Sequence, residues 1–436
     1  MSEKLTLTAG WEDLSHYIKN STELADVVSR IVNDTAITDM HTHLYAPPFG
    51  LLLQGIDEQL RYHYLISEVM RHSPLSSEEF WAMSNRKQAD HIWQVLFLEH
   101  SPYSEACRGV LTTLEQLGLD VKARNLERYR EWYSSRSQDA MVDLVFHKAN
   151  VREVVMTNDP FDEAERSVWL SDTSEAIRQD ERFHAALRLD PLLNDWAHSH
   201  QNLLKWGYDV KANLTEYDRR TFSEVNRFLR EWLERMNALY LSVSLPSTFT
   251  YPSEDERSLL ITHCVIPTCA EANVPLALMI GVKRQVNPKL GPAGDMVGRS
   301  DVEAVEHLCR AFPRNRFLVT MLSRENQHEL TVLARMFPNL MVFGAWWFLN
   351  TPSLVEEITQ MRFELLGTSV IPQHSDARIL EQLLYKWSHA RQVIASVLST
   401  QYQKILDTGW PLDTQDIERD AADLLSNNFW RFVKKN

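Results

Sequence analysis

The sequence of 436 residues is short of glycine and cysteine, and it has no long hydrophobic run. It contains 13 glycines, where an average usage of roughly 7% would give about 30. No stretch reaches the roughly 18 uninterrupted apolar residues of a membrane span, and the first 20 residues lack the apolar region of a secretory signal. The cysteines are too few and too scattered for a disulfide framework; they are Cys107, Cys264, Cys269 and Cys309. We therefore expect a cytoplasmic protein that is not bound to a membrane.

Positive charge is also scarce. Lysine and arginine total 45 against 59 aspartate and glutamate residues, which gives a net charge of −14. An acidic chain is poorly suited to bind nucleic acid or an anionic membrane, so we expect neither partner. An anionic substrate would have to be bound by local arginines. The sequence also lacks the glycine-rich phosphate-binding motifs, so no nucleotide cofactor is expected.

What is present is a repeated alternation of short apolar runs and amphipathic stretches with helical spacing. The apolar runs cover residues 36–43, 151–159, 183–190, 238–245, 275–282, 316–322, 340–346 and 367–375. Nearly continuous apolar strands joined by helices indicate a parallel sheet that is covered on both faces. Eight units, rather than five or six, predict an α/β fold of the closed (β/α)8 TIM-barrel type.

The domain organisation follows from the spacing of these runs. We expect a single barrel domain over residues 1–436, because no glycine-, proline- or serine-rich linker divides the chain. The long interval after the first run contains several amphipathic helical patterns. Residues 51–150 are therefore predicted to form an inserted helical subdomain. A second insertion is expected near 192–237, and a helical tail over 379–435.

A candidate metal site lies at the end of the first run, where His41 and His43 stand two residues apart. Residues i and i+2 of a strand share a face, so both imidazoles can point into the barrel mouth. In a closed barrel the eighth strand lies beside the first, which would bring Asp376 to the same point. If the histidine pair is considered alone, the alternative is that both histidines are structural and form hydrogen bonds at the end of the strand. His374 could be a third imidazole, but we interpret it as structural.

Several segments in order along the chain resemble the uronate isomerases, also called glucuronate isomerases, of the amidohydrolase superfamily. These segments are TDMHTHL (38–44), DEQLRYHYLISEV (57–69), EACRGVL (105–111), ALRLDP (186–191), LGPAGDMVG (290–298), WWFLNTP (346–352), HSDAR (374–378) and SNNFWRF (426–432). The chain is most similar to a divergent branch that carries HSDAR and YKWSHA in place of the more usual TDSR and Arg-His-Glu-Tyr elements.

The resemblance implies a reversible aldose–ketose isomerisation of hexuronates: D-glucuronate to D-fructuronate and D-galacturonate to D-tagaturonate. Such a reaction moves a proton between C2 and C1 through an enediol, which requires an acid/base group and stabilisation of an oxyanion. The small-molecule hexuronate would be the main partner, and a homo-oligomer is possible. The cofactor is expected to be one divalent metal ion, zinc, held by the two histidines and the aspartate of the candidate site.

The resemblance also suggests roles for particular side chains. Arg188 and Arg378 would bind the substrate carboxylate, because a guanidinium group matches a carboxylate in shape and charge; an ordinary salt bridge to Asp190 is the alternative for Arg188. Family resemblance places His63 and Tyr64 in the active site. The predicted roles are catalytic for Asp376, Tyr64 and His63, and substrate-binding for Arg188, Arg378 and Trp347.

Other functions are left open by the residues. Asn158 and Asp159 close the second run, where capping of a turn competes with a catalytic role. The fourth and sixth runs lack the lysine and histidine of two-metal hydrolases, and the fifth has Met279 and Gly281 where a histidine could stand. A mononuclear lactonase or hydrolase of sugar acids is the enzymatic alternative. The non-enzymatic alternative is a sugar-acid-binding protein without catalytic activity.

Overall fold

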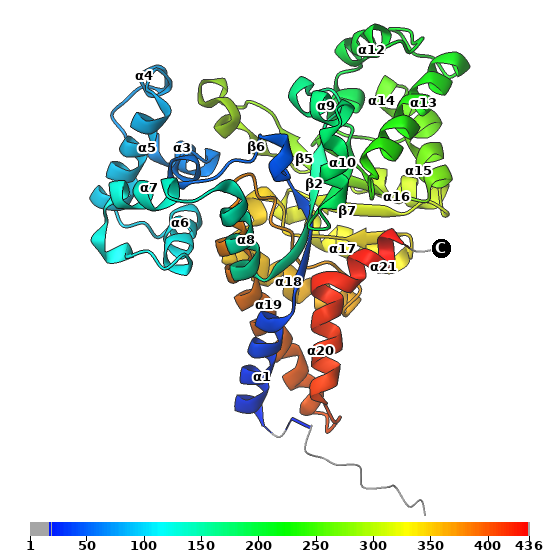
Figure 1. The fold of residues 1–436 in the computed structure, drawn as a ribbon. Coiled ribbons are helices and arrows are strands. Elements are labelled where there is room, and N and C mark those ends of the chain that lie inside the picture. The colour runs from blue at the N-terminus through cyan, green and yellow to red at the C-terminus, as the bar shows by residue number, and fades with distance from the viewer. Residues whose placement is uncertain (1–16, 19, 435–436) are drawn as a thin grey trace, which may run out of the picture.

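A sheet of parallel strands in chain order forms the centre of the molecule. The structure, a computed structural model, describes residues 17–18 and 20–434. The parallel strands are β1 (Ile37–Thr42), β2 (Val151–Asn158), β3 (Phe183–Arg188), β4 (Leu241–Pro246), β5 (Leu276–Lys283), β7 (Phe317–Met321) and β8 (Leu340–Val342). The two-residue strand β6 (Met296–Val297) pairs with β5 in the antiparallel sense. The predicted TIM-barrel type of fold is confirmed (Figure 1).

The eighth apolar run differs from the other seven, because it forms no regular strand. It has one parallel bridge, between Ile371 and Phe343. Pro372 has no N–H group to donate, and Asp376 has a φ of 50°, which a regular strand does not allow. The segment still connects both edges of the sheet: Ile371 N donates to the carbonyl of Val342 (3.1 Å), and Asp376 N donates to the carbonyl of His41 (3.1 Å).

Apolar side chains fill the interior of the barrel. The inward-facing residues include Met40, Val155, Ala186, Tyr240, Ala277, Met279, Leu318, Met341 and Phe343. At the opposite end from the loops that follow the strands, helix α21 (Asn428–Val433) contributes Phe429, whose ring lies 6.2 Å from that of Tyr240. Polar side chains that point inward therefore gather at the carboxyl ends of the strands, where active sites of such barrels form.

The interval between β1 and β2 is helical, as predicted. It contains α2 (Ile56–Leu60), α3 (His63–Val69), α4 (Ser77–Trp81), α5 (Asn85–Trp93), α6 (Glu105–Gln116), α7 (Leu126–Ser134) and α8 (Gln138–Ala149). Helices α3 to α7 lie together on the left of Figure 1. Residues between Ile56 and Tyr129 build a hydrophobic core of their own beside the main one. This second core supports the prediction of an inserted subdomain over 51–150, which stays a prediction.

The remaining helices cover the outside of the barrel. They are α9 (Glu163–Leu170), α10 (Thr173–Gln179), α11 (Asp190–Asn194), α12 (Trp196–Lys205), α13 (Arg219–Met236), α14 (Glu256–Leu260), α15 (Ile266–Ala272), α16 (Glu303–Ala311), α17 (Gln327–Met336) and α18 (Pro352–Leu366). The tail contains α19 (Gln382–Leu406) and α20 (Thr414–Ala422). Together with α1 (Ser21–Asp34), the far part of α19 and α20 projects at the bottom of Figure 1.

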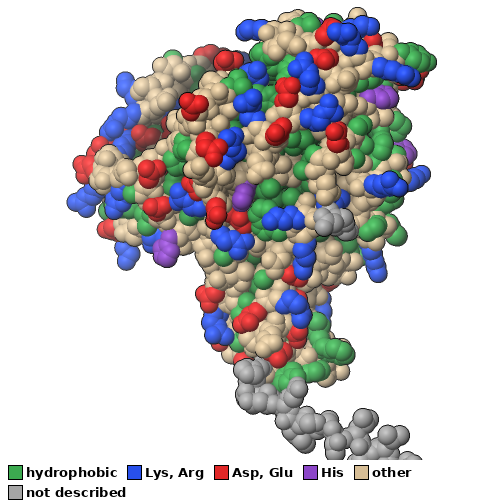
Figure 2. All heavy atoms as spheres, turned by 45° about the vertical axis from the view of Figure 1, so that its right-hand side comes forward, with side chains coloured by type: hydrophobic (Ala, Val, Ile, Leu, Met, Phe, Trp, Pro, Cys, Tyr) green, Lys and Arg blue, Asp and Glu red, His purple; other side chains and the backbone are tan. Residues whose placement is uncertain are grey.

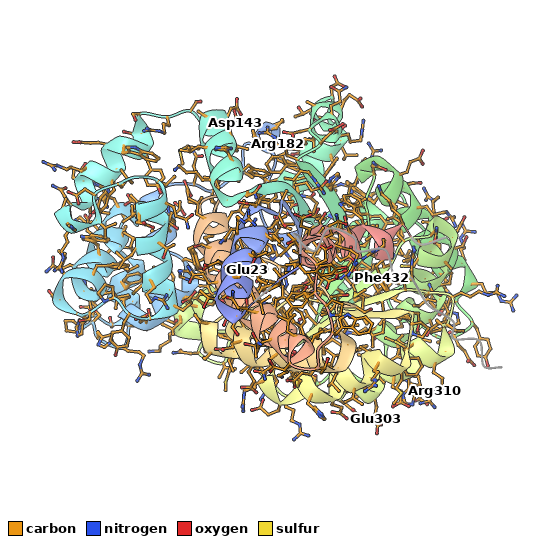
Figure 3. The ribbon with its side chains drawn as sticks, turned by 90° about the horizontal axis from the view of Figure 1, so that it is seen from below. Glu23, Asp143, Arg182, Glu303, Arg310 and Phe432 are labelled. Atoms are coloured by element: carbon orange, nitrogen blue, oxygen red, sulfur yellow. The ribbon has the colours of Figure 1, made fainter. Side chains whose placement is uncertain are left out.

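Charged side chains of both signs are interspersed over the face of the molecule in Figure 2. Many form ion pairs between neighbouring elements. Asp143 of α8, for example, lies 2.7 Å from Arg182, which precedes β3, and Figure 3 shows the two residues side by side. Among the described helices, none is both long enough and apolar enough to cross a membrane.

Candidate active site

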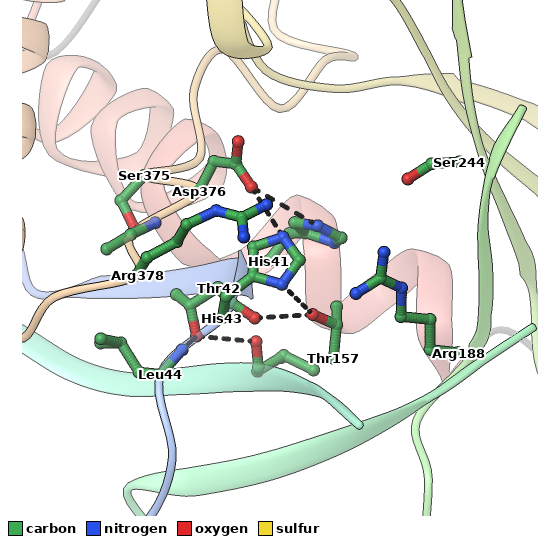
Figure 4. Close-up of polar contacts among 12 residues, drawn as sticks. His41, Thr42, His43, Leu44, Thr157, Arg188, Ser244, Ser375, Asp376 and Arg378 are labelled. Carbon is green, nitrogen blue, oxygen red and sulfur yellow. Dashed lines mark hydrogen bonds and ion pairs between the residues drawn. The ribbon is translucent and has the colours of Figure 1, made fainter. Parts of the chain in front are cut away.

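Two imidazoles and one carboxylate meet at the mouth of the barrel, as the sequence predicted. The Nε2 atoms of His41 and His43 lie 3.8 and 3.2 Å from Oδ1 of Asp376. One ligand atom from each residue lies within 4.8 Å of the others (Figure 4). His41 and Asp376 are 3% and 7% exposed, so the group is held inside the protein rather than on its surface.

Hydrogen bonds on the far side of each ring indicate which nitrogen carries the proton. The hydroxyl of Thr157 donates to the carbonyl of Thr42 (2.9 Å), so it must accept from Nδ1 of His43 at 3.1 Å. The hydroxyl of Tyr240 donates to the carbonyl of Met40 (2.5 Å) and lies 3.5 Å from Nδ1 of His41. Each neutral ring with its proton on Nδ1 turns a free Nε2 lone pair toward the carboxylate.

The charge states make this cluster a fitting cation site. Burial lowers the pKa of His41 to about 3 and that of His43 to about 4, so both rings are neutral near pH 7. Burial alone would raise the pKa of Asp376, but its surroundings, among them the ammonium of Lys386, outweigh this effect and hold the pKa well below its usual value. An oxygen of the Asp376 carboxylate that has no hydrogen-bond partner among the residues the structure describes therefore faces two nitrogen lone pairs. A divalent metal ion would satisfy all three donors and keep an open position.

Asp39, two residues before His41, holds the loop that carries Asp376. Its Oδ1 accepts from Ser375 N (3.1 Å), and its Oδ2 accepts from the indole N–H of Trp387 (2.8 Å). Burial raises the pKa of Asp39 to about 6. The first strand therefore positions His41 and His43 and also supports the segment that carries Asp376.

The two arginines predicted to bind the substrate carboxylate lie on either side of the His41–His43–Asp376 cluster (Figure 4). Arg188, at the end of β3, donates from Nη2 to Oδ1 of Asp190 at 2.9 Å. This salt bridge is the alternative considered for the residue, but it uses only one of five N–H groups. The charge of Arg378 acts on His43 and on His63.

The remaining predicted residues lie together in an aromatic cluster beside the barrel mouth. The ring of His63 lies 4.5 Å from that of Tyr64 and 5.7 Å from that of Trp347, which comes from the loop after β8. His63 Nε2, the Tyr64 hydroxyl and the Trp347 indole nitrogen are buried without a hydrogen-bond partner among the described residues. Burial, with a smaller contribution from Arg378, lowers the pKa of His63 to about 3, and burial raises that of Tyr64.

Other candidates have local structural contacts. Asp159 accepts a hydrogen bond from Phe161 N (2.9 Å), and the amide of Asn158 donates to Glu165 (2.9 Å), so both hold the turn after β2. Sequence reasoning missed Thr157, Lys386 and Trp387. Thr157 gave a faint signal, since it lies near the end of a run predicted to lie beside the first strand. The YKWSHA segment was noted only as a mark of the branch.

His374 lies one layer deeper, outside the three-residue cluster. Its ring is 5.5 Å from that of His41 at an interplanar angle of 83°, and neither of its nitrogens has a hydrogen-bond partner in the described part of the chain. It packs against the backbone of Gly344, which has a φ of 64°. A Cβ at Gly344 would lie 1.8 Å from Nδ1 of His374.

Gly344→Ala is accordingly expected to lower the free energy of unfolding by about 3 kcal/mol, through left-handed backbone strain and a steric clash. Gly50→Ala is the matched control, because Gly50 has a φ of 68° in the left-handed region and nothing within 4 Å of the added carbon. It should lose about 1 kcal/mol from backbone strain alone. Urea denaturation measures both variants, and equal losses would contradict tight packing of His374.

Comparison with known structures identifies the family. The chain is 54% identical to a uronate isomerase from Bacillus halodurans C-125, whose crystal structure it matches with a TM-score of 0.93 over 96% of this chain and 98% of that one. The chain belongs to the uronate isomerase family. A uronate isomerase from Thermotoga maritima and a glucuronate isomerase from Caulobacter crescentus share the fold at 14% and 16% identity, each with a TM-score of 0.76. They cover 98% of this chain and 100% and 97% of their own. No family model matches the chain, and neither does any curated protein.

Membership of the uronate isomerase family confirms three predictions made from the sequence. The resemblance to uronate isomerases is correct, the protein is an enzyme, and its reaction class is aldose–ketose isomerisation.

Proposed function

We propose that this enzyme interconverts D-glucuronate with D-fructuronate and D-galacturonate with D-tagaturonate. The observation that carries the proposal is the convergence of His41, His43 and Asp376 in a chain that is 54% identical to a uronate isomerase over nearly its whole length. The substrate is then a small sugar acid, which binds at the mouth of the barrel.

One divalent ion, zinc, is the proposed cofactor, held by Nε2 of His41, Nε2 of His43 and Oδ1 of Asp376. Two imidazole nitrogens and one carboxylate oxygen are ligand types that zinc prefers, and three protein ligands leave a position open. Such an ion, when bound, would polarise substrate oxygens and stabilise negative charge that develops on them.

Substrate orientation is proposed to come from the two arginines. Arg188 retains N–H groups beyond the one that binds Asp190, and Arg378 lies on the other side of the cluster. Either guanidinium can bind the substrate carboxylate with two parallel hydrogen bonds. Trp347 is proposed to line the pocket, where its indole N–H has no partner in the described part of the chain and could donate to a sugar oxygen.

Proton transfer between C2 and C1 requires a base and an acid, and the charge states of the site suggest which groups serve. Asp376 is ionised and His63 is neutral near pH 7, so each can accept a proton. The raised pKa of Tyr64 keeps its phenol protonated, which suits it to donate a proton or a hydrogen bond to a substrate oxygen. We propose Asp376, His63 and Tyr64 as the catalytic residues on this basis.

We also propose the domain organisation, the assembly and the location of the enzyme. The described part of the chain would form one barrel domain with the helical subdomain of residues 51–150 inserted after β1, supported by the separate core between Ile56 and Tyr129; residues 1–16, 19 and 435–436 of the predicted domain lie outside the described residues. A homo-oligomer and a cytoplasmic location complete the proposal.

In the test, purified protein is mixed with D-glucuronate or with D-galacturonate in deuterated water, with and without a chelator. Formation of the ketouronate is followed by proton NMR. We expect the matching ketouronate from each sugar, with deuterium at the transferred position where an enediol exchanges its proton. The chelator should slow the reaction if the metal contributes. Folded, metal-loaded protein that gives no product would contradict the proposal. Hydrolysis of a uronolactone would then favour a lactonase, and a raised Tm without turnover would favour a binding protein.

A further inference from the structure

Lys386 is a buried lysine next to the active site, and apart from the effect of its charge on Asp376 it has no role in the chemistry described above. It lies in the first turns of α19 and is 3% exposed. Its ammonium donates to the backbone carbonyl of Ser375 at 2.5 Å and lies 5.8 Å from the ring centre of Tyr62. Burying a charged ammonium is costly unless it is paired. Negative charge acts on it from Asp376 and, to a smaller extent, from Asp39.

The carbonyl that Lys386 binds belongs to the peptide unit that leads into Asp376. The N–H of the same unit donates to the carbonyl of His41 (3.1 Å). The peptide is therefore held on both sides: Lys386 binds its carbonyl, and the carbonyl of His41 binds its N–H. Ser375 N is held as well, through its bond to Asp39.

This support matters because the backbone of Asp376 is strained. Its φ of 50° lies in the left-handed region, which costs energy for a residue with a Cβ, although aspartate adopts it more readily than most. Rotation of the peptide between Ser375 and Asp376 would relieve the strain. A change of φ at Asp376 that is not compensated at Ser375 would also reorient the Cα–Cβ bond, so that the carboxylate would no longer face His41 and His43.

We infer that Lys386 is a positioning residue: its bond to the Ser375 carbonyl holds the preceding peptide so that the Asp376 carboxylate faces His41 and His43. The inference rests on the proposed metal site and on the proposed role of Asp376. It assigns to the helix after the barrel a direct part in the geometry of the cluster.

Lys386→Met tests the inference, because methionine fills similar space without an N–H donor. A hydrogen bond to a charged group has a net strength that corresponds to about 10- to 100-fold in rate, so we expect kcat to fall by about that factor. KM should change by less than about threefold, because Lys386 contacts no substrate group in this assignment. Binding of Co²⁺ to the metal-free protein should weaken about tenfold, and the visible spectrum of the bound ion should shift.

Two controls separate positioning from simple loss of stability. Thr331→Val removes a buried hydroxyl that donates to Gln327 at 2.6 Å in α17, away from the site; it should lower stability and leave kcat and Co²⁺ binding unchanged. If Lys386→Met does not fold, Lys386→Gln is measured instead. The shorter glutamine side chain ends before the Ser375 carbonyl but keeps a polar group in the buried site.

The outcomes distinguish the inference from the proposal on which it rests. A folded Lys386 variant with wild-type kcat and wild-type Co²⁺ binding overturns the inference. Failure of the wild-type protein to bind Co²⁺ overturns the metal proposal instead, and the kcat of the Lys386 variant then decides whether it positions Asp376. A fall in kcat with altered Co²⁺ binding supports both.

Discussion

Asp376→Asn is expected to lower turnover by about 10³-fold or more, because it removes a proposed metal ligand and a proposed base from one position. The variant should fold, since asparagine has nearly the same shape and tolerates a φ of 50° at least as well as aspartate. Its amide keeps one oxygen but loses the negative charge that faces His41 and His43. The measurement is kcat by NMR with each uronate, together with the metal content of the purified protein.

Asp143→Asn is the matched control for this change. Asp143 is 72% exposed and pairs with Arg182 on the outside of the barrel (Figure 3), so the same substitution there should leave kcat and metal content unchanged. Wild-type turnover in Asp376→Asn would refute the assignment of the site. A large loss of metal with a small loss of kcat would keep Asp376 as a ligand but remove the metal from the reaction.

The part of this site that the sequence reveals is the part encoded by local pattern. His41 and His43 share a strand face because of their spacing, and Asp376 follows the last apolar run. A closed barrel then brings the three together, as the distances confirm. The parallel strands were predictable for the same reason, because nearly continuous apolar runs of similar length alternate with helices.

The parts that the sequence did not reveal depend on contacts between distant residues or on backbone strain. The last run looks like a strand, but Pro372 and the left-handed Asp376 prevent a regular ladder. Asp39 and Trp387 lie 348 residues apart in sequence, and only the folded structure shows their hydrogen bond. Lys386 reads as one charge on an amphipathic helix, because nothing local shows that its ammonium points inward.

Arg188→Met is expected to raise KM about 10- to 100-fold for both uronates, with a smaller change in kcat. A charge-assisted bond to the substrate carboxylate would be lost equally from the ground state and the transition state, since that carboxylate is remote from C1 and C2. Steady-state kinetics by NMR measures both constants. Arg378→Met should show the same pattern if the carboxylate lies between the two guanidinium groups, and unchanged kinetics in both variants would place the carboxylate elsewhere.

The substitution at Arg188 also has a structural consequence that must be separated from substrate binding. The carboxylate of Asp190 accepts hydrogen bonds from Arg188 and from Ser244 N (3.1 Å). The positive charge of Arg188 keeps the pKa of Asp190 low against the effect of burial. Without the guanidinium, a mostly buried carboxylate loses its partner, at a cost of about 1–3 kcal/mol in unfolding free energy. The double variant Arg188→Met/Asp190→Asn should recover part of that stability and keep the raised KM. If KM recovers with stability, Arg188 acts by supporting the fold of the loop, and Arg378 alone binds the substrate carboxylate.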